Sequence, residues 1–110
     1  MVELYEKDKH ILAKIKVKRV DVSNADDLNA MLSKVDNSKD LLLDVSELNF
    51  IDSSGIGIIV VLYKRYMKVN KIFGLIGLSD RVCNILKIVG LVGVLKLFND
   101  EGEYLRGKKE

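Results

Sequence analysis

The segment Asp52-Ser53-Ser54-Gly55 holds the residue types in this sequence that are best suited to chemistry. It separates two apolar stretches, and its spacing predicts that Ser53 is the N-cap of a helix beginning at Ser54. The first turn of a helix offers unpaired N–H groups and a partial positive charge, which favour an anion. Gly55 and Gly57 lack side chains, so a bound group could approach that backbone closely. Spacing alone leaves two interpretations: an ordinary serine cap, or a serine that accepts a phosphate.

The surroundings of Ser53 argue against common catalytic motifs. A nucleophile elbow needs glycine two residues before the serine, and Ile51 occupies that position. His10, the one histidine of the sequence, is expected at the surface in a polar turn. No Gly-Lys-Ser or Gly-Lys-Thr follows a glycine-rich loop, so the sequence has no P-loop. These observations favour a protein that is not an enzyme and uses no cofactor.

Asp44 ends an apolar stretch, as the phosphoacceptor aspartate of a two-component receiver does. A receiver also needs an acidic pair after its first strand to hold magnesium. Here the first strand leads through Glu6-Lys7-Asp8 into a hairpin rather than into a crossover helix. We therefore interpret Asp44 as a turn or cap residue.

The composition indicates one small folded domain over residues 1–110. The chain is 48% hydrophobic and carries a net charge of +2, without the concentrated basic charge of a nucleic-acid-binding domain. Cys83 is the one cysteine, so we expect a buried thiol and a reducing, cytoplasmic setting. The sequence shows no signal peptide and no apolar run of about twenty residues, so no membrane span is expected. Arg106, Lys108 and Lys109 are expected in a solvated tail.

The elements that must position the motif alternate between strands and helices. Two alternating segments, 2–6 and 11–17, flank a polar turn and predict a hairpin. Three further strands are expected at 41–43, 72–75 and 92–98. Helices are expected at 25–34, at 56–67, after Ser79-Asp80 and after Asn99-Asp100. This order predicts an α/β domain with a mostly parallel sheet, an N-terminal hairpin and about four helices.

The helix at 56–67 has more apolar positions than one buried face requires. The residues expected to line the core are Ile56, Ile59, Val60 and Tyr63. The surplus residues are Ile58, Val61 and Leu62. A neighbouring helix could cover them, or they could form an exposed patch beside Ser53 that contacts a partner.

Several segments, taken in order, resemble the bacterial anti-sigma factor antagonists of the STAS domain class. The matching segments are Leu41-Leu42-Leu43-Asp44-Val45-Ser46, Phe50-Ile51-Asp52-Ser53-Ser54-Gly55-Ile56-Gly57, Leu78-Ser79-Asp80-Arg81-Val82, Ile85-Leu86 and Gly90-Leu91. Together with the hairpin they cover nearly the whole chain. The segment with the two serines is the most specific of them.

The resemblance implies a partner-switching mechanism. An unphosphorylated antagonist binds an anti-sigma factor that is also a serine kinase, and so frees a sigma factor. The kinase then uses ATP to phosphorylate the serine after the motif aspartate, which is Ser53 here, with Ser54 as second choice. A PP2C-type phosphatase restores the active form, and no direct contact with nucleic acid or membrane is implied. The partner-binding residues implied are Asp21, Asp52, Ser53, Ser54, Gly55, Ile56, Gly57 and Ile58.

The sequence departs from the family pattern where Lys18-Arg19-Val20-Asp21 replaces a frequent Gly-Glu-Leu-Asp segment. That segment helps to form the partner surface, so the departure affects the identity of the partner more than the fold. Two alternatives remain open. One is a STAS module of a stress-sensing or transporter-linked complex, and the other is a small enzyme or nucleotide-binding domain.

Overall fold

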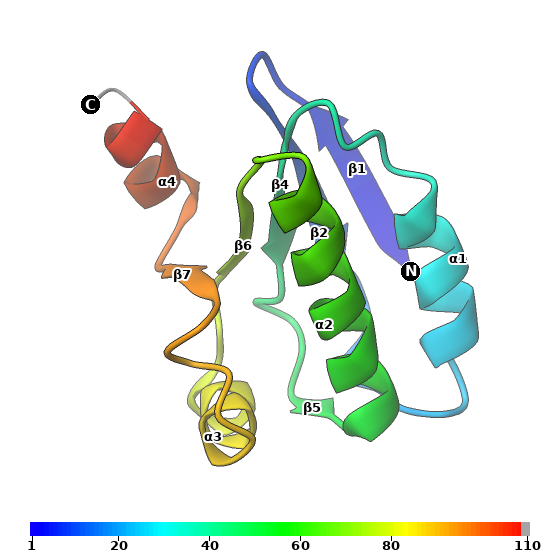
Figure 1. Ribbon diagram of the computed structural model, residues 1–110. Coiled ribbons are helices and arrows are strands. Elements are labelled where there is room, and N and C mark those ends of the chain that lie inside the picture. Colours follow the sequence, from blue (N-terminus) through cyan, green and yellow to red (C-terminus); the bar gives the residue numbers. More distant parts are fainter. Residues whose placement is uncertain (109–110) are drawn as a thin grey trace.

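The computed structural model describes residues 1–108, and the end of the expected tail, 109–110, lies outside the described residues. The described residues form an α/β fold with the expected hairpin, parallel sheet and helices (Figure 1). In chain order the elements are β1 (Val2–Glu6), β2 (His10–Ile15), β3 (Arg19–Val20), α1 (Ala25–Ser33), β4 (Asp40–Asp44), β5 (Phe50–Ile51), α2 (Ser53–Lys68), β6 (Phe73–Ile76), α3 (Asp80–Ile88), β7 (Lys96–Phe98) and α4 (Glu101–Lys108).

Five strands form the main sheet in the order β1-β2-β4-β6-β7. β1 runs antiparallel to β2, which confirms the hairpin, and the remaining neighbours are parallel. Each parallel connection contains one helix, because parallel neighbours need a crossover. α1 and α2 lie side by side over one face of the sheet (Figure 1), and α4 packs on the opposite face.

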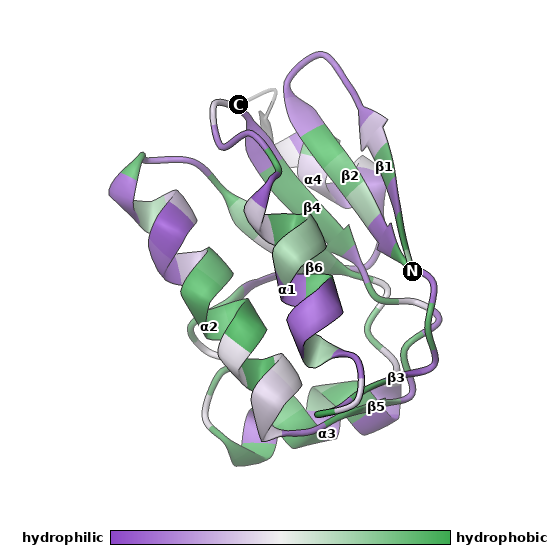
Figure 2. Cartoon of the chain, turned by 90° about the vertical axis from the view of Figure 1, so that its right-hand side faces the viewer, coloured by the Kyte–Doolittle hydropathy of each residue, from purple (hydrophilic) through white to green (hydrophobic). Residues whose placement is uncertain are grey.

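The leucine run of β4 is buried on both faces of the sheet, as expected from its continuous apolar sequence. Leu41 and Leu43 belong to the larger core beneath α1, α2 and α3. Leu42 points to the other face and packs in a smaller cluster with Tyr104 of α4. Strand alternation therefore divides one short segment between two cores. Green hydrophobic colour follows the central strands in Figure 2.

α2 begins earlier than expected and presents a different stripe to the sheet. Its buried residues are Gly55, Ile58, Ile59, Leu62 and Tyr66. The predicted core residues Ile56, Val60 and Tyr63 are only half-buried, and Val61 is exposed. The prediction had the helical period right and the face wrong by about one residue. Gly55 explains the difference, because its missing side chain lets this edge of the helix lie against β3 and β5.

His10 is also placed differently from its predicted surface position, because it begins β2 and is only 3% exposed. Its Nε2 atom lies 2.5 Å from a Glu101 carboxylate oxygen, and its ring packs edge-on against Tyr104. The Tyr104 hydroxyl donates to Asp40 at 2.6 Å, and Asp40 pairs with His10 across β2 and β4. These contacts attach α4 to the start of the sheet.

β3 and β5 form a separate two-stranded parallel sheet at one end of the molecule. Arg19 pairs with Phe50, and Val20 pairs with Ile51. The chain leaves β5 and enters α2 one residue later. Figures 1 and 2 show β5, the start of α2 and α3 gathered at this end. The motif therefore lies at the junction of three elements.

Candidate functional site

The N-cap of α2 is Asp52, and the prediction that Ser53 caps this helix is wrong. Asp52 has an extended backbone, and its Oδ1 atom accepts the Ser54 N–H at 2.9 Å and the Gly55 N–H at 3.3 Å. A carboxylate binds these two donors more strongly than a hydroxyl does, because its charge also complements the helix dipole. Ser53 becomes the first helical residue, and its hydroxyl is not needed for capping.

The two serines of the motif lie in different environments. The Ser54 hydroxyl donates to Asp52 Oδ1 at 2.5 Å, and its residue is half-buried. Ser53 is exposed, and its hydroxyl has no hydrogen-bond partner among residues 1–108. The structure therefore leaves Ser53 accessible to another protein and uses Ser54 to support the cap.

Like the two serines, the two glycines of the motif lie in different environments, one buried and one exposed. A Cβ atom on Gly55 would lie 2.5 Å from Ile51 Cγ1 and 2.9 Å from Val20 Cγ1, so this glycine faces the core rather than a bound group. A Cβ atom on Gly57 would meet nothing within 4 Å, and this residue is exposed. Ile58 is buried beneath them. Among the expected contact residues, Gly55 and Ile58 thus shape the site from below.

Two carboxylates lie beside Ser53 because β3 and β5 are paired. The Asp52 N–H donates to the Val20 carbonyl at 3.1 Å, which places Asp52 next to Asp21. The hydrogen bond from the Ser54 hydroxyl lowers the pKa of Asp52, despite an opposing contribution from Asp21. Hydrogen bonds from Ser23 and Arg19 lower the pKa of Asp21. Both groups are therefore ionised at neutral pH, and the surface around Ser53 is acidic.

A groove that the sequence analysis did not identify adjoins this acidic surface. Its lining residues are Arg19, Phe50, Arg81, Asn84, Ile85 and Ile88, which we call the α3 groove. The four residues from α3 follow a helical spacing of i, i+3, i+4 and i+7, which is the one signal in the sequence that could have revealed them. The Arg19 guanidinium lies 4.7 Å from the centre of the Phe50 ring.

The described residues contain no group of three or more His, Cys, Asp or Glu side chains that could hold a metal ion. Cys83 is half-buried rather than buried as expected. Asp44 accepts the Ser46 N–H at 2.9 Å, which confirms its role as a turn residue. No helix within residues 1–108 is long and apolar enough to cross a membrane.

Comparison with known proteins gives the family. The sequence model of the STAS domain matches residues 2–104. The chain belongs to the STAS domain family. This STAS domain is 35% identical over 63 residues to the anti-sigma-B factor antagonists of Listeria monocytogenes and Listeria innocua. The matched region is 57% of this chain and 55% of each relative. The match therefore spans about half the length of the curated relatives.

Solved structures confirm the fold. A putative anti-sigma factor antagonist from Thermotoga maritima superposes with a TM-score of 0.84 at 20% identity, over 99% of this chain and 95% of that one. The antagonist SpoIIAA in its unphosphorylated form gives 0.78 at 16% identity, over 100% and 98% of the chains. The murine anion transporter Slc26a9 gives 0.77 at 18% identity, over 96% of the STAS domain and 19% of the transporter. The same fold thus occurs in antagonists and in a transporter.

Proposed function

We propose that this STAS domain is an anti-sigma factor antagonist. Its unphosphorylated form binds an anti-sigma factor that is also a serine kinase, which frees a sigma factor, and phosphorylation of Ser53 ends the binding. The observation that carries the proposal is the exposed Ser53 hydroxyl at the first position of α2. The similarity to the two Listeria anti-sigma-B factor antagonists supports the same function.

Ser53 is the proposed phosphate acceptor, and Ser54 is the second choice. A kinase must bring the acceptor oxygen in line with the γ-phosphate of ATP, which requires an accessible hydroxyl. Ser53 meets this condition, whereas the Ser54 hydroxyl is held by Asp52 at 2.5 Å. Phosphorylation of Ser54 would also remove a donor from the cap, so it would disturb the start of α2.

Electrostatic repulsion accounts for the proposed switch. A phosphate adds about −1.5 to −2 charge at neutral pH. The N-terminus of α2 tolerates this charge, because the helix dipole stabilises it by ~0.3–2 kcal/mol. Against a partner, however, the phosphate would add to the charges of Asp21 and Asp52. A loss of about 2.7 kcal/mol weakens binding a hundredfold, so local charge can switch binding without refolding the domain.

The proposed contact surface consists of the accessible residues of the motif and its neighbour. They are Asp21, Asp52, Ser53, Ser54, Ile56 and Gly57, with Gly55 and Ile58 supporting them from the core. The chain itself performs no catalysis in this proposal and needs no cofactor or metal. A separate PP2C-type phosphatase resets Ser53, and the exchange of partners takes place in the cytoplasm.

The test begins with affinity capture from native lysate, with Ser53→Ala and Ser53→Asp as paired baits. We expect the alanine variant to retain an anti-sigma factor kinase and the aspartate variant to lose it. The purified kinase with ATP should then place one phosphate on Ser53, mapped by mass spectrometry. Circular dichroism should show the same spectrum for both variants.

A Ser54→Ala variant is the matched control, because it removes the neighbouring hydroxyl and leaves Ser53 in place. It should still accept one phosphate, whereas Ser53→Ala should accept none. If the kinase adds a stoichiometric phosphate to neither Ser53 nor Ser54 of the wild-type chain, the proposed function is contradicted. Loss of the fold in Ser53→Asp would contradict the account based on local charge.

A further inference from the structure

The α3 groove begins where the motif surface ends. Phe50 lies two positions before Asp52 in the chain, and Arg19 forms an ion pair with Asp21 at 3.1 Å. Arg19 and Phe50 also pair across β3 and β5. The groove and the acidic surface around Ser53 are therefore adjacent parts of one face of the molecule.

The exposed side of α3 is mostly polar, and Ile88 is an exposed apolar residue within it. Ile88 is 85% exposed, and Ile85 and Phe50 are half-buried beside it. Val82 and Leu86 hold the opposite side of the helix in the core, so Ile88 is not needed to anchor α3. Ile88, Ile85 and Phe50 line the same groove, so together they offer a surface on which an apolar side chain of a partner can pack.

The charge of the groove is positive, in contrast to the surface around Ser53. Its lining includes two arginines and no carboxylate. Arg19 is already paired with Asp21, but the Arg81 side chain is exposed and has no polar partner among residues 1–108. A guanidinium offers a planar set of donors that matches a carboxylate in two places at once. Charge complementarity therefore indicates an acidic group as the occupant.

The size of a stable interface also argues for a contact beyond the motif. Specific protein complexes usually bury about 800 Å² on each partner, supplied by roughly 20–30 residues. The accessible residues around Ser53 are too few to provide that area. The groove, of about 620 Å³, is the adjoining surface with both apolar and charged groups.

We propose that the α3 groove binds a segment of the anti-sigma factor kinase that carries a carboxylate next to an apolar side chain. The carboxylate pairs with Arg81, and the apolar side chain packs against Ile88 and Phe50. Recognition then has two parts: the groove selects the partner, and the charge at Ser53 decides whether it stays bound. This inference rests on the proposed function.

The test measures binding of the purified kinase to unphosphorylated chains by calorimetry, together with phosphorylation of Ser53. Arg81→Glu and Ile88→Asp should each raise the Kd by about tenfold or more, because each removes a central groove contact. Both positions are exposed, so the fold should persist, which circular dichroism checks. Raising the salt concentration should weaken wild-type binding more than binding of Arg81→Ala.

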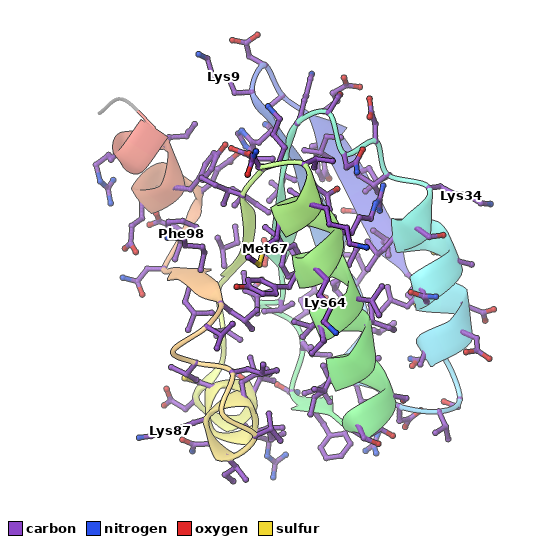
Figure 3. All side chains as sticks on the ribbon, viewed as in Figure 1. Lys9, Lys34, Lys64, Met67, Lys87 and Phe98 are labelled. Atoms are coloured by element: carbon purple, nitrogen blue, oxygen red, sulfur yellow. The ribbon has the colours of Figure 1, made fainter. Side chains whose placement is uncertain are left out.

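Lys87→Glu is the matched control. Lys87 is an exposed residue of α3 outside the groove, and its side chain extends away from α2 (Figure 3). Lys87→Glu and Arg81→Glu each replace a positive side chain with a negative one. The Kd of Lys87→Glu should nevertheless stay within about threefold of the wild-type value. An equal loss in both variants would overturn the groove contact in favour of a non-specific charge effect.

The outcomes separate this inference from the proposed function. If the wild-type chain neither binds the kinase nor is phosphorylated, both are overturned. If the wild type binds and is phosphorylated on Ser53 while Arg81→Glu and Ile88→Asp keep the wild-type Kd, the groove inference alone is overturned. A selective loss in the two groove variants supports both.

Discussion

At the scale of single residues, Asp52 gives the two serines of the motif different roles. Its carboxylate caps α2 and holds the Ser54 hydroxyl, which leaves the Ser53 hydroxyl exposed. A serine at the N-cap would have used its own oxygen to accept backbone N–H groups. Because the aspartate caps the helix, phosphorylation of Ser53, the proposed acceptor, would not remove a capping group. The aspartate also makes the start of α2 sensitive to acid.

Asp52→Asn should reveal this sensitivity. Hydrogen bonds from Ser54 lower the pKa of Asp52 below its ordinary value of 3.8. A carboxyl group whose pKa is lowered on folding stabilises the folded state above its unfolded pKa, and that stability is lost as the pH falls through the folded pKa. The wild type should therefore melt at a higher temperature than Asp52→Asn at pH 7, and the difference should close below pH 3.8.

Thermal melts across this pH range measure the effect, and an NMR titration of Asp52 gives an independent check. In Ser54→Ala the main cause of the lowered pKa is gone, so the pKa of Asp52 should return toward its ordinary value. A difference in melting temperature that does not depend on pH would show that the charge of Asp52 contributes nothing to the cap.

At the scale of elements, the position of α2 depends on what it packs against at each end. At its N-terminal end, Gly55 lies against Ile51 of β5 and Val20 of β3. In its last turns, the Arg65 guanidinium donates to the carbonyl of Leu32, in the last turn of α1, and to the carbonyl of Val35, just beyond that helix. Contacts at both ends thus fix the helix, and with it the height of Ser53 above the small β3–β5 sheet.

Gly55→Ala should destabilise the folded domain, and Gly57→Ala should not. The new methyl group on residue 55 would overlap Ile51, which should lower the free energy of unfolding by about 1–3 kcal/mol. The same change at residue 57 meets open space and should raise it by about 0.5–1 kcal/mol, because alanine favours a helix. Urea denaturation of the two variants measures both effects. Equal effects would contradict the assigned face of α2.

At the scale of the whole molecule, the sequence predicted what depends on local pattern. The leucine run identified the central strand, and Ser79 caps α3 where a helix was expected to begin. The misplaced features depend on distant contacts. His10 is buried because Glu101, 91 positions later, lies beside it. The groove requires β3, β5 and α3 to meet, and the spacing of residues within α3 can indicate only the part that α3 contributes.

The proposed contact surface and the contacts of α4 lie on opposite faces of the sheet. The motif and the α3 groove lie on the side of the larger core, whereas Tyr104 of α4 closes the smaller cluster on the opposite face. The Tyr104 hydroxyl donates to Asp40, and burial together with this hydrogen bond raises the pKa of Tyr104. A change at Tyr104 should therefore affect the stability of the domain without changing its contact surface.

Tyr104→Phe should lower the free energy of unfolding by about 1–3 kcal/mol at neutral pH, because Asp40 loses a buried hydrogen-bond donor. A group whose pKa is raised on folding contributes stability that is lost as the pH rises. Above the ordinary tyrosine value of 10.0 the free energy of unfolding of the wild type should fall. It should fall less in the variant, because the variant lacks the raised pKa of Tyr104. Urea denaturation between neutral and alkaline pH measures both effects.

The binding control uses the same variant at neutral pH. The Kd of Tyr104→Phe for the kinase and the rate of its phosphorylation on Ser53 should match those of the wild type. A loss of binding in Tyr104→Phe would contradict the separation of the two faces.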